Sequence, residues 1–492
     1  MRKFLYTIVA LLAALTATSC LYGLGTDEGT DVENTSGFKA EVSTNVISAN
    51  GEDSAAFRAF FNGEDVTAEA TLYDAQTNEA LESMSFSTLT MGSYSFYVVY
   101  GEYRSEVIDV KAVLDIDLTD KDEQGITVTL STNLVQVGKG YAAFIIRYNG
   151  KVLTADELAK VSVYNAADDT KVVIDTENSI GSEFNYVIVV DENDAEHTLL
   201  AFSPNEAGVR SFWFGYKTKN TRETPVSVTA VATDIPSRPV DPQPANTEFV
   251  QRVLFTQLTG TWCGYCPNMI EAFHYMFEEE NYKDKFVHTA VHGSDQFATT
   301  LPDGRDLASI LNTSGSYPYT IVNLSSGLNT NNSVENNIGA IMGAIENRLK
   351  TPARAGIAAR TELKDNMLLV RTSIKVSYSG DYSIGAWLVE SGLYAKQSNS
   401  TSVKEDYIDI HENVVRIADS NPSGIDFLGH PVGYVNKGET ADHLFVMELD
   451  PEWKVENCHL VLFVSTTQYN QYQITNAVKT ASLTSGVEFE YK

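Results

Sequence analysis

The sequence contains little cysteine and few basic residues. Only four of its 492 residues are cysteine, which excludes a disulfide-dense scaffold. Lysine and arginine number 35 against 65 aspartate and glutamate residues, giving a net charge of −30. Because phosphate groups repel so acidic a chain, we expect no nucleic-acid partner. Hydrophobic residues make up 43% of the chain, which is enough for several packed cores and argues against general disorder.

Long apolar runs are also missing from the interior of the chain. Beyond the N-terminus, no run reaches the roughly 18 apolar residues that a membrane-spanning helix needs. The N-terminus itself has Arg2 and Lys3, then an almost wholly apolar stretch over 4–15 and small residues before Cys20. This order is typical of an export signal, so we predict a signal peptide over 1–19.

Cys20 directly follows four small residues and resembles the modified cysteine of bacterial lipoproteins. That resemblance implies that Cys20 carries an acyl anchor in the outer-membrane lipid, and ordinary secretion with an incidental Cys20 is the alternative. Residues 20–37 are rich in glycine, threonine and acidic side chains. We predict that they form a flexible tether.

Residues 38–233 show short strands separated by turns, in two units that echo one another. The sequence Gly92–Phe96 is echoed at Gly208–Phe212, and Asn62-Gly63 at Asn149-Gly150. Asn-Gly between apolar runs is a strong hairpin signal. One predicted strand alternates aromatic and apolar residues on a single face, at Tyr94, Phe96, Val98 and Tyr100. The pattern predicts two immunoglobulin-like β-sandwich modules, over 38–112 and 113–233.

The remaining chain begins with a proline-rich segment over 234–247, which holds four of the 13 prolines and is predicted to be an extended linker. Strands then alternate with helices as far as residue 350. One of these helices is predicted to begin after Ser333. The alternation predicts a central α/β domain over 248–350. Residues 351–492 return to strand patterning and predict a C-terminal β-sandwich.

The motif that carries chemistry is Cys263-Gly264-Tyr265-Cys266, between a predicted strand and a predicted helix. Two intervening residues let the two sulfurs meet across one turn. The free N–H groups and the dipole of the helix start stabilise the thiolate of the first cysteine. The motif therefore predicts Cys263 as an attacking thiol and Cys266 as the resolving thiol.

The sequence from Trp262 to Pro267 resembles the redox motif of the thioredoxin fold. In that fold a cis-proline loop beside the cysteines accepts the substrate backbone. The resemblance implies that Pro318 is this cis-proline and that Tyr317 faces the disulfide. Trp262, Tyr317 and Pro318 are therefore the candidate substrate-binding residues.

A longer resemblance extends over about 248–492. The residues that carry it are Leu254–Pro267, Tyr317-Pro318, Ile321–Asn323, His411–Arg416, Trp453 and Glu456-Asn457. In these segments the sequence resembles the Omp28-related outer-membrane lipoproteins of Bacteroidetes. The resemblance implies a thioredoxin-like central domain and a lipid-anchored cell-envelope protein that faces either the periplasm or the outside.

One residue departs from these families. Thioredoxins carry a buried acid six residues before the first cysteine, and Omp28-like chains usually have glutamate there. This chain has Gln257, which cannot ionise and therefore cannot supply acid–base help to Cys266. A static disulfide that staples the helix start is consequently an alternative for Cys263 and Cys266.

Other chemically active side chains have simpler interpretations. His288 and His292 share one strand face, but no second C-x-x-C accompanies them, so we expect no metal site and no cofactor. His411 is expected to lie in a loop whose polar residues cap turns. Cys458 precedes an apolar strand and is expected to be a buried small hydrophobe, with mixed-disulfide formation as the alternative.

Two functions fit these features. The first is an envelope lipoprotein that exchanges thiols and disulfides with exported proteins and is reset by a redox partner. The second is a surface binding or adhesive lipoprotein in which the thioredoxin fold is a non-catalytic scaffold and the disulfide is structural. The accessibility of the Cys263 sulfur discriminates between an enzyme and a binding protein.

Overall fold

The computed structural model describes residues 37–492 except 115, 177–180, 191–194, 302–303, 405, 420–428 and 469–470. The predicted signal peptide and Cys20, the predicted lipidation site, lie outside the described residues. The chain divides into two compact units, Met1–Asp234 and Ile235–Lys492.

The first unit begins with two sheets that share an aromatic core. The first sheet has the order β1-β3-β4, with β6 beside β3, and the second has the order β2-β9-β7-β5, with β8 beside β7. Phe96 and Val98 of β7 are buried in this core, and Tyr94 and Tyr100 pack against it, as the alternation predicts. The elements are β1 (Phe38–Val42), β2 (Val46–Ser48), β3 (Ala55–Phe61), β4 (Glu64–Asp65), η1 (Thr67–Glu69), β5 (Thr71–Asp74), β6 (Ser85–Phe86), β7 (Gly92–Tyr100), β8 (Tyr103–Arg104) and β9 (Ile108–Val113).

The rest of the first unit repeats part of this plan. Its sheet β11-β19-β17-β14 has the same order and strand directions as β2-β9-β7-β5, and it packs on a sheet of order β10-β12-β16-β15. The shared core is centred on Phe144, Phe184, Phe212 and Phe214. The elements are β10 (Ile126–Leu130), β11 (Leu134–Gln136), β12 (Ala142–Tyr148), β13 (Lys151–Val152), α1 (Ala155–Leu158), β14 (Ser162–Asn165), β15 (Phe184–Val190), β16 (Glu196–Phe202), β17 (Gly208–Tyr216), β18 (Lys219–Asn220) and β19 (Val226–Val231).

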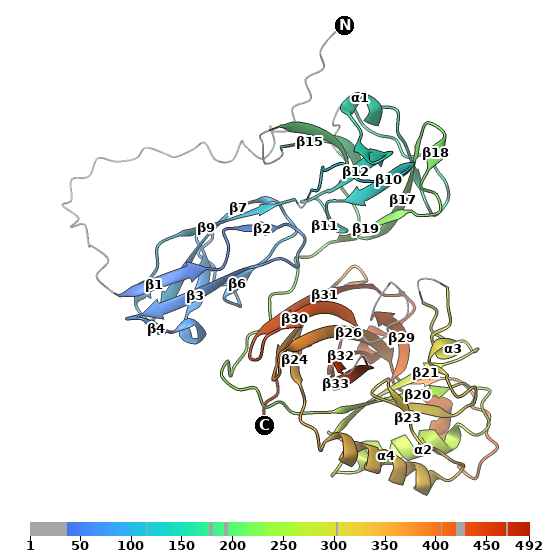
Figure 1. Cartoon of the computed structure of the whole chain (residues 1–492). Helices are drawn as coiled ribbons and strands as arrows, with labels where there is room; N and C mark the ends of the chain where they lie inside the picture. The colour runs from blue at the N-terminus through green and yellow to red at the C-terminus, as the bar shows by residue number, and fades with distance from the viewer. Residues whose placement is uncertain are drawn as a thin grey trace. The chain divides into compact units, whose positions relative to one another are not determined.

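The second unit is built on one nine-stranded mixed sheet (Figure 1). Its path is β23-β22-β20-β21-β29-β26-β32-β33, with β30 beside β26. The strands of this sheet are β20 (Val253–Thr259), β21 (Phe286–His292), β22 (Tyr319–Val322), β23 (Ser326–Gly327), β26 (Gly380–Glu390), β29 (Val414–Asp419), β30 (His430–Val435), β32 (Cys458–Gln468) and β33 (Gln471–Lys479).

The predicted fold class is wrong for this unit. Among the described residues, 248–350 do not form a separate α/β thioredoxin-like domain, because β21 pairs with β29 at Ala290 and Val414 and so continues into the C-terminal strands. Among the described residues, strands far outnumber helices. The predicted C-terminal β-sandwich likewise shares its larger sheet with the segment that precedes it.

Both faces of the shared sheet are buried, which explains the continuous apolar run in β32. Leu460 and Leu462 face a core closed by the three-stranded sheet β24-β25-β31, whereas Val461 and Phe463 face a second core. Strands buried on both faces lose the polar–apolar alternation of a half-exposed strand. The strands of the smaller sheet are β24 (Ala355–Lys364), β25 (Met367–Val376) and β31 (Thr440–Glu448).

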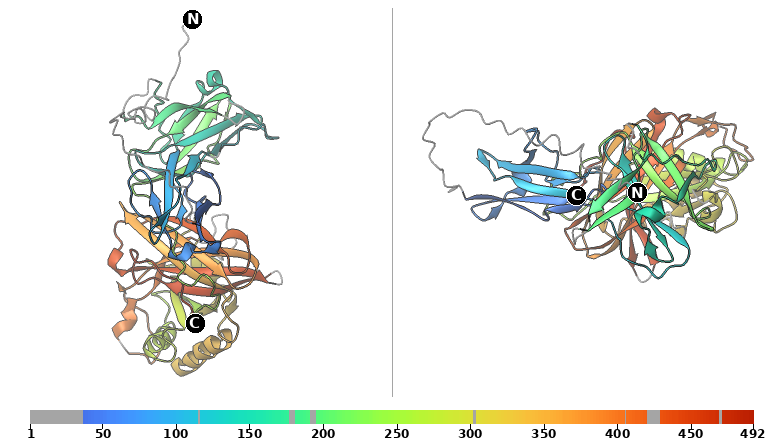
Figure 2. Two further views of the ribbon diagram at one scale, coloured as in Figure 1. Left: turned by 90° about the vertical axis from the view of Figure 1, so that its left-hand side faces the viewer. Right: turned by 90° about the horizontal axis from the view of Figure 1, so that it is seen from above.

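Helices α2 (Pro267–Glu278) and α4 (Val334–Arg348) cover one face of β20 to β22 (Figure 1). They gather at one end of this unit in the left view of Figure 2. The Ser333 side chain accepts a hydrogen bond from the backbone N–H of Asn336, which confirms the predicted start of α4. Helix α3 (Leu307–Leu311) packs on the opposite face of the sheet.

A hairpin-like excursion leaves the sheet between β26 and β29. It comprises residues 391–413, which we call the covering segment, and contains β27 (Leu393–Tyr394), η2 (Asp406–Asp409) and β28 (Ile410–His411). Its two ends pair through β27 and β28. A last short helix, η3 (Val455–Asn457), precedes β32.

Candidate functional site

The cysteine turn links the end of β20 to the start of α2. Cys263 and Cys266 form a disulfide, with their Cα atoms 5.4 Å apart, and Pro267 occupies the first turn of the helix. Neither cysteine is accessible: Cys263 is 4% exposed and Cys266 is 0% exposed. An attacking thiol needs an accessible sulfur, and a residue as buried as Cys263 offers little surface for attack in this conformation.

The covering segment closes over this turn through four hydrogen bonds to its backbone carbonyls. The Gln397 side-chain Nε2 donates to Gly260 O at 3.1 Å and to Cys263 O at 2.9 Å. The backbone N–H of Ser398 donates to Thr261 O and that of Ser400 to Gly264 O, each at 2.7 Å. The approach at Gly264 is so close that an added Cβ would lie 2.5 Å from Ser400 Oγ. The covering segment therefore packs closely against the turn that contains the disulfide.

The residues predicted to bind a substrate backbone lie beside this turn. The Tyr317–Pro318 peptide bond is cis. The Trp262 ring packs edge to face on Tyr317, with centroids 5.1 Å apart, and its Nε1 donates to Gly293 O. Trp262 is 49% exposed, so an aromatic surface flanks the covered disulfide.

Gln257 is the inner end of a directed chain of hydrogen bonds. Lys479 Nζ donates to Asn413 Oδ1 at 2.6 Å, and Asn413 Nδ2 lies 3.3 Å from His288 Nδ1. His288 Nε2 in turn lies 3.1 Å from Gln257 Oε1. An ammonium group only donates, so Lys479 fixes the direction of every later bond. Gln257 Nε2 is left as a donor with no hydrogen-bond partner among the described residues.

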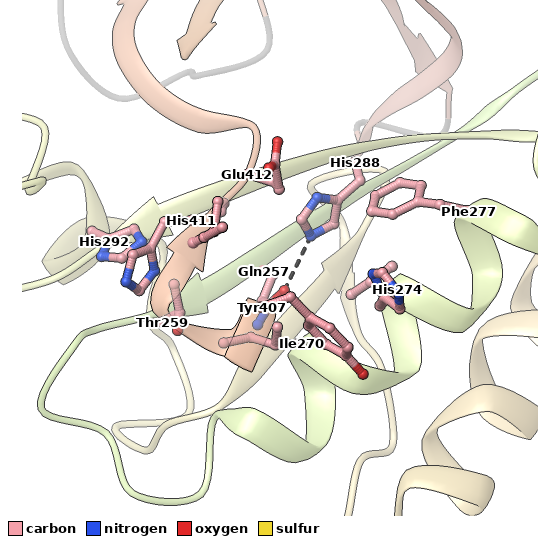
Figure 3. Close-up of a pocket in the computed structure, with 13 residues that line it drawn as sticks. Gln257, Thr259, Ile270, His274, Phe277, His288, His292, Tyr407, His411 and Glu412 are labelled. Atoms are coloured by element: carbon pink, nitrogen blue, oxygen red, sulfur yellow. Dashed lines mark hydrogen bonds between the residues drawn. The ribbon is translucent and has the colours of Figure 1, made fainter. Parts of the chain in front are cut away.

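A pocket of about 160 Å³ lies where this chain ends, on the face of the sheet that carries α2 (Figure 3). Strands β20 and β21 form its floor, α2 forms one wall and the covering segment forms the other. The lining residues are Gln257, Thr259, Ile270, Phe273, His274, Phe277, His288, Ala290, His292, Tyr407, Ile410, His411 and Glu412. The covering segment thus closes both the disulfide and this pocket.

His292 lies at the end of the pocket next to His411, and their ring centroids are 4.9 Å apart. Its Nδ1 is 2.8 Å from Asp295 Oδ2. Burial by itself raises the pKa of Asp295, but hydrogen bonds from His292 and from two backbone N–H groups lower that pKa below its ordinary value. The ionised carboxylate can only accept, so His292 Nδ1 donates to it. His292 Nε2 has no partner among the described residues.

Two pocket histidines are kept neutral by their surroundings. Burial, with a smaller effect from Lys479, lowers the pKa of His288 to about 3. Burial, with a smaller effect from His292, lowers the pKa of His411 to about 4. Both rings are therefore uncharged near neutral pH. In the described part of the chain, no group of three or more histidine, cysteine or acidic side chains is arranged to hold a metal ion.

Replacing His288 by glutamine is expected to make the protein less sensitive to acid. The unfolded chain takes up a proton at His288 near pH 6.5, whereas the folded protein resists protonation down to about pH 3, so stability falls as the pH falls through this window. Between pH 7 and pH 5 this residue alone removes about 2 kcal/mol of unfolding free energy. Urea unfolding of wild type and His288→Gln at both pH values measures the difference. Equal losses in the two proteins would contradict the assignment.

Cys458 lies away from both sites, at the start of β32. It is 0% exposed, and burial raises the pKa of its thiol to about 12. Its Sγ donates to Lys454 O at 3.3 Å. The thiol is thus held in its uncharged, unreactive form.

Sequence reasoning missed the pocket, although it noted several of its residues. In the sequence, Gln257 is notable because it replaces an acid, and His288 and His292 because they share one strand face. His411 is predicted to lie in a loop. The sequence pattern that could have indicated the pocket is the placement of these residues at every second position, and so on one face, of two neighbouring strands. They are Gln257 and Thr259 on β20, and His288, Ala290 and His292 on β21. Ile270, Tyr407 and Ile410 carried no signal of their own.

The fold and the sites define a β-rich protein whose C-terminal unit carries a covered disulfide and a small pocket. Residues 308–483 match the model of the Omp28 family, described as outer membrane protein Omp28. The match includes the covering segment and most of the C-terminal strands, but not the cysteine turn. The similarity of this segment to a family described as an outer membrane protein supports a location in the cell envelope. None of the helices in the described part of the chain has the length and apolarity to span a membrane.

Three solved structures illustrate more distant likenesses. HBP35 of Porphyromonas gingivalis is 17% identical over 48% of this chain and 77% of its own, with a TM-score of 0.40. A domain of the outer membrane lipoprotein Omp28 from Porphyromonas gingivalis is 18% identical over 28% of this chain and 89% of its own, with a TM-score of 0.18. Invasin, a bacterial integrin-binding protein, is 11% identical over 90% of this chain and 59% of its own, with a TM-score of 0.15. These TM-scores are low, so no function is transferred from them. Among curated proteins, none matches the chain.

Proposed function

We propose that this chain is a lipid-anchored binding protein of the outer membrane and that Cys263–Cys266 is a structural disulfide. The observation that carries the proposal is the burial of both cysteine residues in a turn held by the covering segment. In this function Cys20 bears the acyl anchor. The β-sandwiches of the first unit are spacers that lie between the anchor and the second unit along the chain.

Three features agree with a non-enzymatic role. Gln257 cannot ionise, so it cannot move a proton to or from Cys266. Its amide is instead engaged by His288, which is itself neutral. The closed disulfide lies in the turn between β20 and α2, the elements that form part of the floor and one wall of the pocket.

Thiol–disulfide exchange is the second candidate function, favoured by the exposed Trp262 ring on Tyr317. Its partners would be the thiols and disulfides of exported proteins, together with a redox protein that resets the pair. Exchange would require the covering segment to leave the cysteine turn before any thiolate could attack.

The reactivity of the disulfide in the folded full chain tests the proposal. We expect no faster reduction of insulin than with a Cys263→Ser/Cys266→Ser variant, and a reduction potential below about −300 mV. Acceleration of insulin reduction that Cys263→Ser abolishes would overturn the proposal in favour of exchange.

Loosening the cover should expose the disulfide to reductant. Replacing Gln397 by alanine removes the side chain that holds two buried carbonyls, at an expected cost of about 1–3 kcal/mol of local stability. Reduction through local opening should then be about 5–150 times faster. The rate of thiol release in dithiothreitol measures the effect.

Lys396 offers the matched control for this variant. It precedes Gln397, and its side chain is 82% exposed and pairs with Asp409. Because exposed ion pairs contribute little, Lys396→Ala should change the rate by less than about fivefold. A wild-type rate for Gln397→Ala would show that these contacts do not limit access to the disulfide.

A further inference from the structure

The pocket between β20, β21, α2 and the covering segment contains three buried polar atoms that form no hydrogen bond within the described protein. Gln257 Nε2, Thr259 Oγ1 and His292 Nε2 have no hydrogen-bond partner among the described residues. Gln257 and Thr259 are each 2% exposed, and His292 is 0% exposed. Buried polar groups are nearly always paired, so three in one pocket indicate something that binds there.

The orientation of these atoms restricts the chemistry of a ligand. The hydrogen-bond chain from Lys479 fixes Gln257 Nε2 as a donor, so a ligand must present an acceptor to it. The Thr259 hydroxyl can donate or accept. His292 Nε2 accepts while its ring is neutral, because Nδ1 donates to Asp295. A hydroxyl group on the ligand can satisfy both kinds of partner.

The remaining walls fit a single ring. Phe273, Phe277 and Tyr407 supply aromatic surface, and Ile270 and Ile410 supply aliphatic surface. His274 stacks on Tyr407 with ring centroids 4.0 Å apart and joins α2 to the covering segment. The volume of about 160 Å³ is close to the roughly 150 Å³ of an apolar cavity known to accept benzene.

The charges around the pocket favour a neutral ligand. No lysine or arginine lines it, and the buried His288 and His411 are uncharged near neutral pH. Glu412 is an exposed lining residue, and the Asp295 carboxylate lies behind His292. An anion would meet no free cation here, and a cation would meet the donor of Gln257.

We propose that this pocket binds a small, neutral, ring-shaped molecule that carries a hydroxyl group, of the chemical class of phenol. This inference rests on the proposed function, because it gives the binding protein a ligand. Ring and aliphatic carbons would contact the walls of α2 and the covering segment. The hydroxyl oxygen would accept from Gln257 Nε2 and from the Thr259 hydroxyl, and its hydrogen would be donated to His292 Nε2.

The test is a titration of the folded full chain with phenol, followed by saturation-transfer NMR. We expect saturable binding with a dissociation constant on the order of 1 mM or below, in view of the few atoms that phenol contributes. Toluene, which lacks the hydroxyl, should bind about 3–10 times more weakly, as should benzoate, which adds a negative charge.

Thr259→Val is the decisive variant, because it removes a hydroxyl that makes no hydrogen bond within the described protein. Folding should therefore be unchanged, while phenol binding should weaken about 3–10-fold. Thr372→Val is the matched control: Thr372 is also buried and unpartnered among the described residues, but it lies on β25 outside the pocket. This variant should bind phenol as the wild type does.

A filling variant, Ala290→Leu, should abolish binding, because Ala290 lines the floor of the pocket. The proposal is overturned by the absence of saturable phenol binding, by equal affinities of wild type and Thr259→Val, or by binding that survives in a folded Ala290→Leu protein. The first of these results would mean that the pocket holds water only. None of them bears on the disulfide assays above, since neither cysteine lines the pocket.

Discussion

Replacing Trp387 by alanine is expected to lower the unfolding free energy of the second unit by about 3–5 kcal/mol. Trp387 lies on β26, is 0% exposed and packs edge to face on Phe463. The same core contains Leu254 and Leu258 of β20. Removing the indole leaves a cavity in this core, which is built from β20 and from the C-terminal strands β26 and β32. Urea unfolding, followed by circular dichroism, measures the loss.

Because the sheet is shared by the two segments, a second result is expected for this variant. If β20 and β21 fold as one body with β26 and β32, then the rise in disulfide reduction that accompanies unfolding must have the same urea midpoint as the loss of β-structure, above the slower reduction that occurs through local opening of the covering segment. Both transitions should move together in Trp387→Ala. Two separate transitions, with only one displaced, would show that the cysteine-bearing segment folds independently.

Tyr434 provides the control for loss of an aromatic side chain. It lies on β30 of the same sheet but is 65% exposed. Surface substitutions of this kind usually change stability by no more than about 0.5 kcal/mol. A comparable loss in Tyr434→Ala would mean that the effect of Trp387→Ala does not come from the core.

The elements of the second unit were more predictable than their assembly. Strand β20, the start of α2 and the N-cap of α4 each follow from a local pattern. The prediction that residues 248–350 form a separate α/β domain was wrong. The contact that joins it to the rest is the pairing of β21 with β29, which links Ala290 to Val414. Pairing between residues so far apart leaves no mark on the local sequence.

The same contrast applies to the site. The cysteine turn could be predicted because its two cysteines lie within four consecutive residues. Its closure was not, because Gln397 reaches it from more than a hundred residues away. The pocket combines residues from three elements and the covering segment, and its polar atoms were identifiable as unsatisfied only once their neighbours were known.

The proline-rich segment over 234–247 was predicted to be an extended linker, yet part of it is bound to the second unit. Lys375 of β25 has a side chain only 1% exposed, and its Nζ donates to Asp241 Oδ2 at 2.6 Å. It also donates to the carbonyls of Gln243 and Pro244. The phenol of Tyr491 donates to the other oxygen of Asp241. A buried ammonium thus fixes the path of the segment.

Asp241→Ala is therefore expected to cost about 3–5 kcal/mol, because it leaves the buried Lys375 ammonium without its counter-ion. Glu280→Ala, which breaks the exposed pair with Lys283, should cost less than about 1 kcal/mol. Urea unfolding of the full chain, observed in the transition of the second unit, compares the two variants.

A double variant separates the ion pair from simple packing. Lys375→Met in the Asp241→Ala background removes the unpaired charge while keeping an apolar chain of similar length. Because the penalty arises from the buried charge, the double variant should be more stable than Asp241→Ala alone. A double variant less stable than either single variant would mean that the segment is held by packing. The charge on Lys375 would then have little part in attaching residues 241–244 to β25.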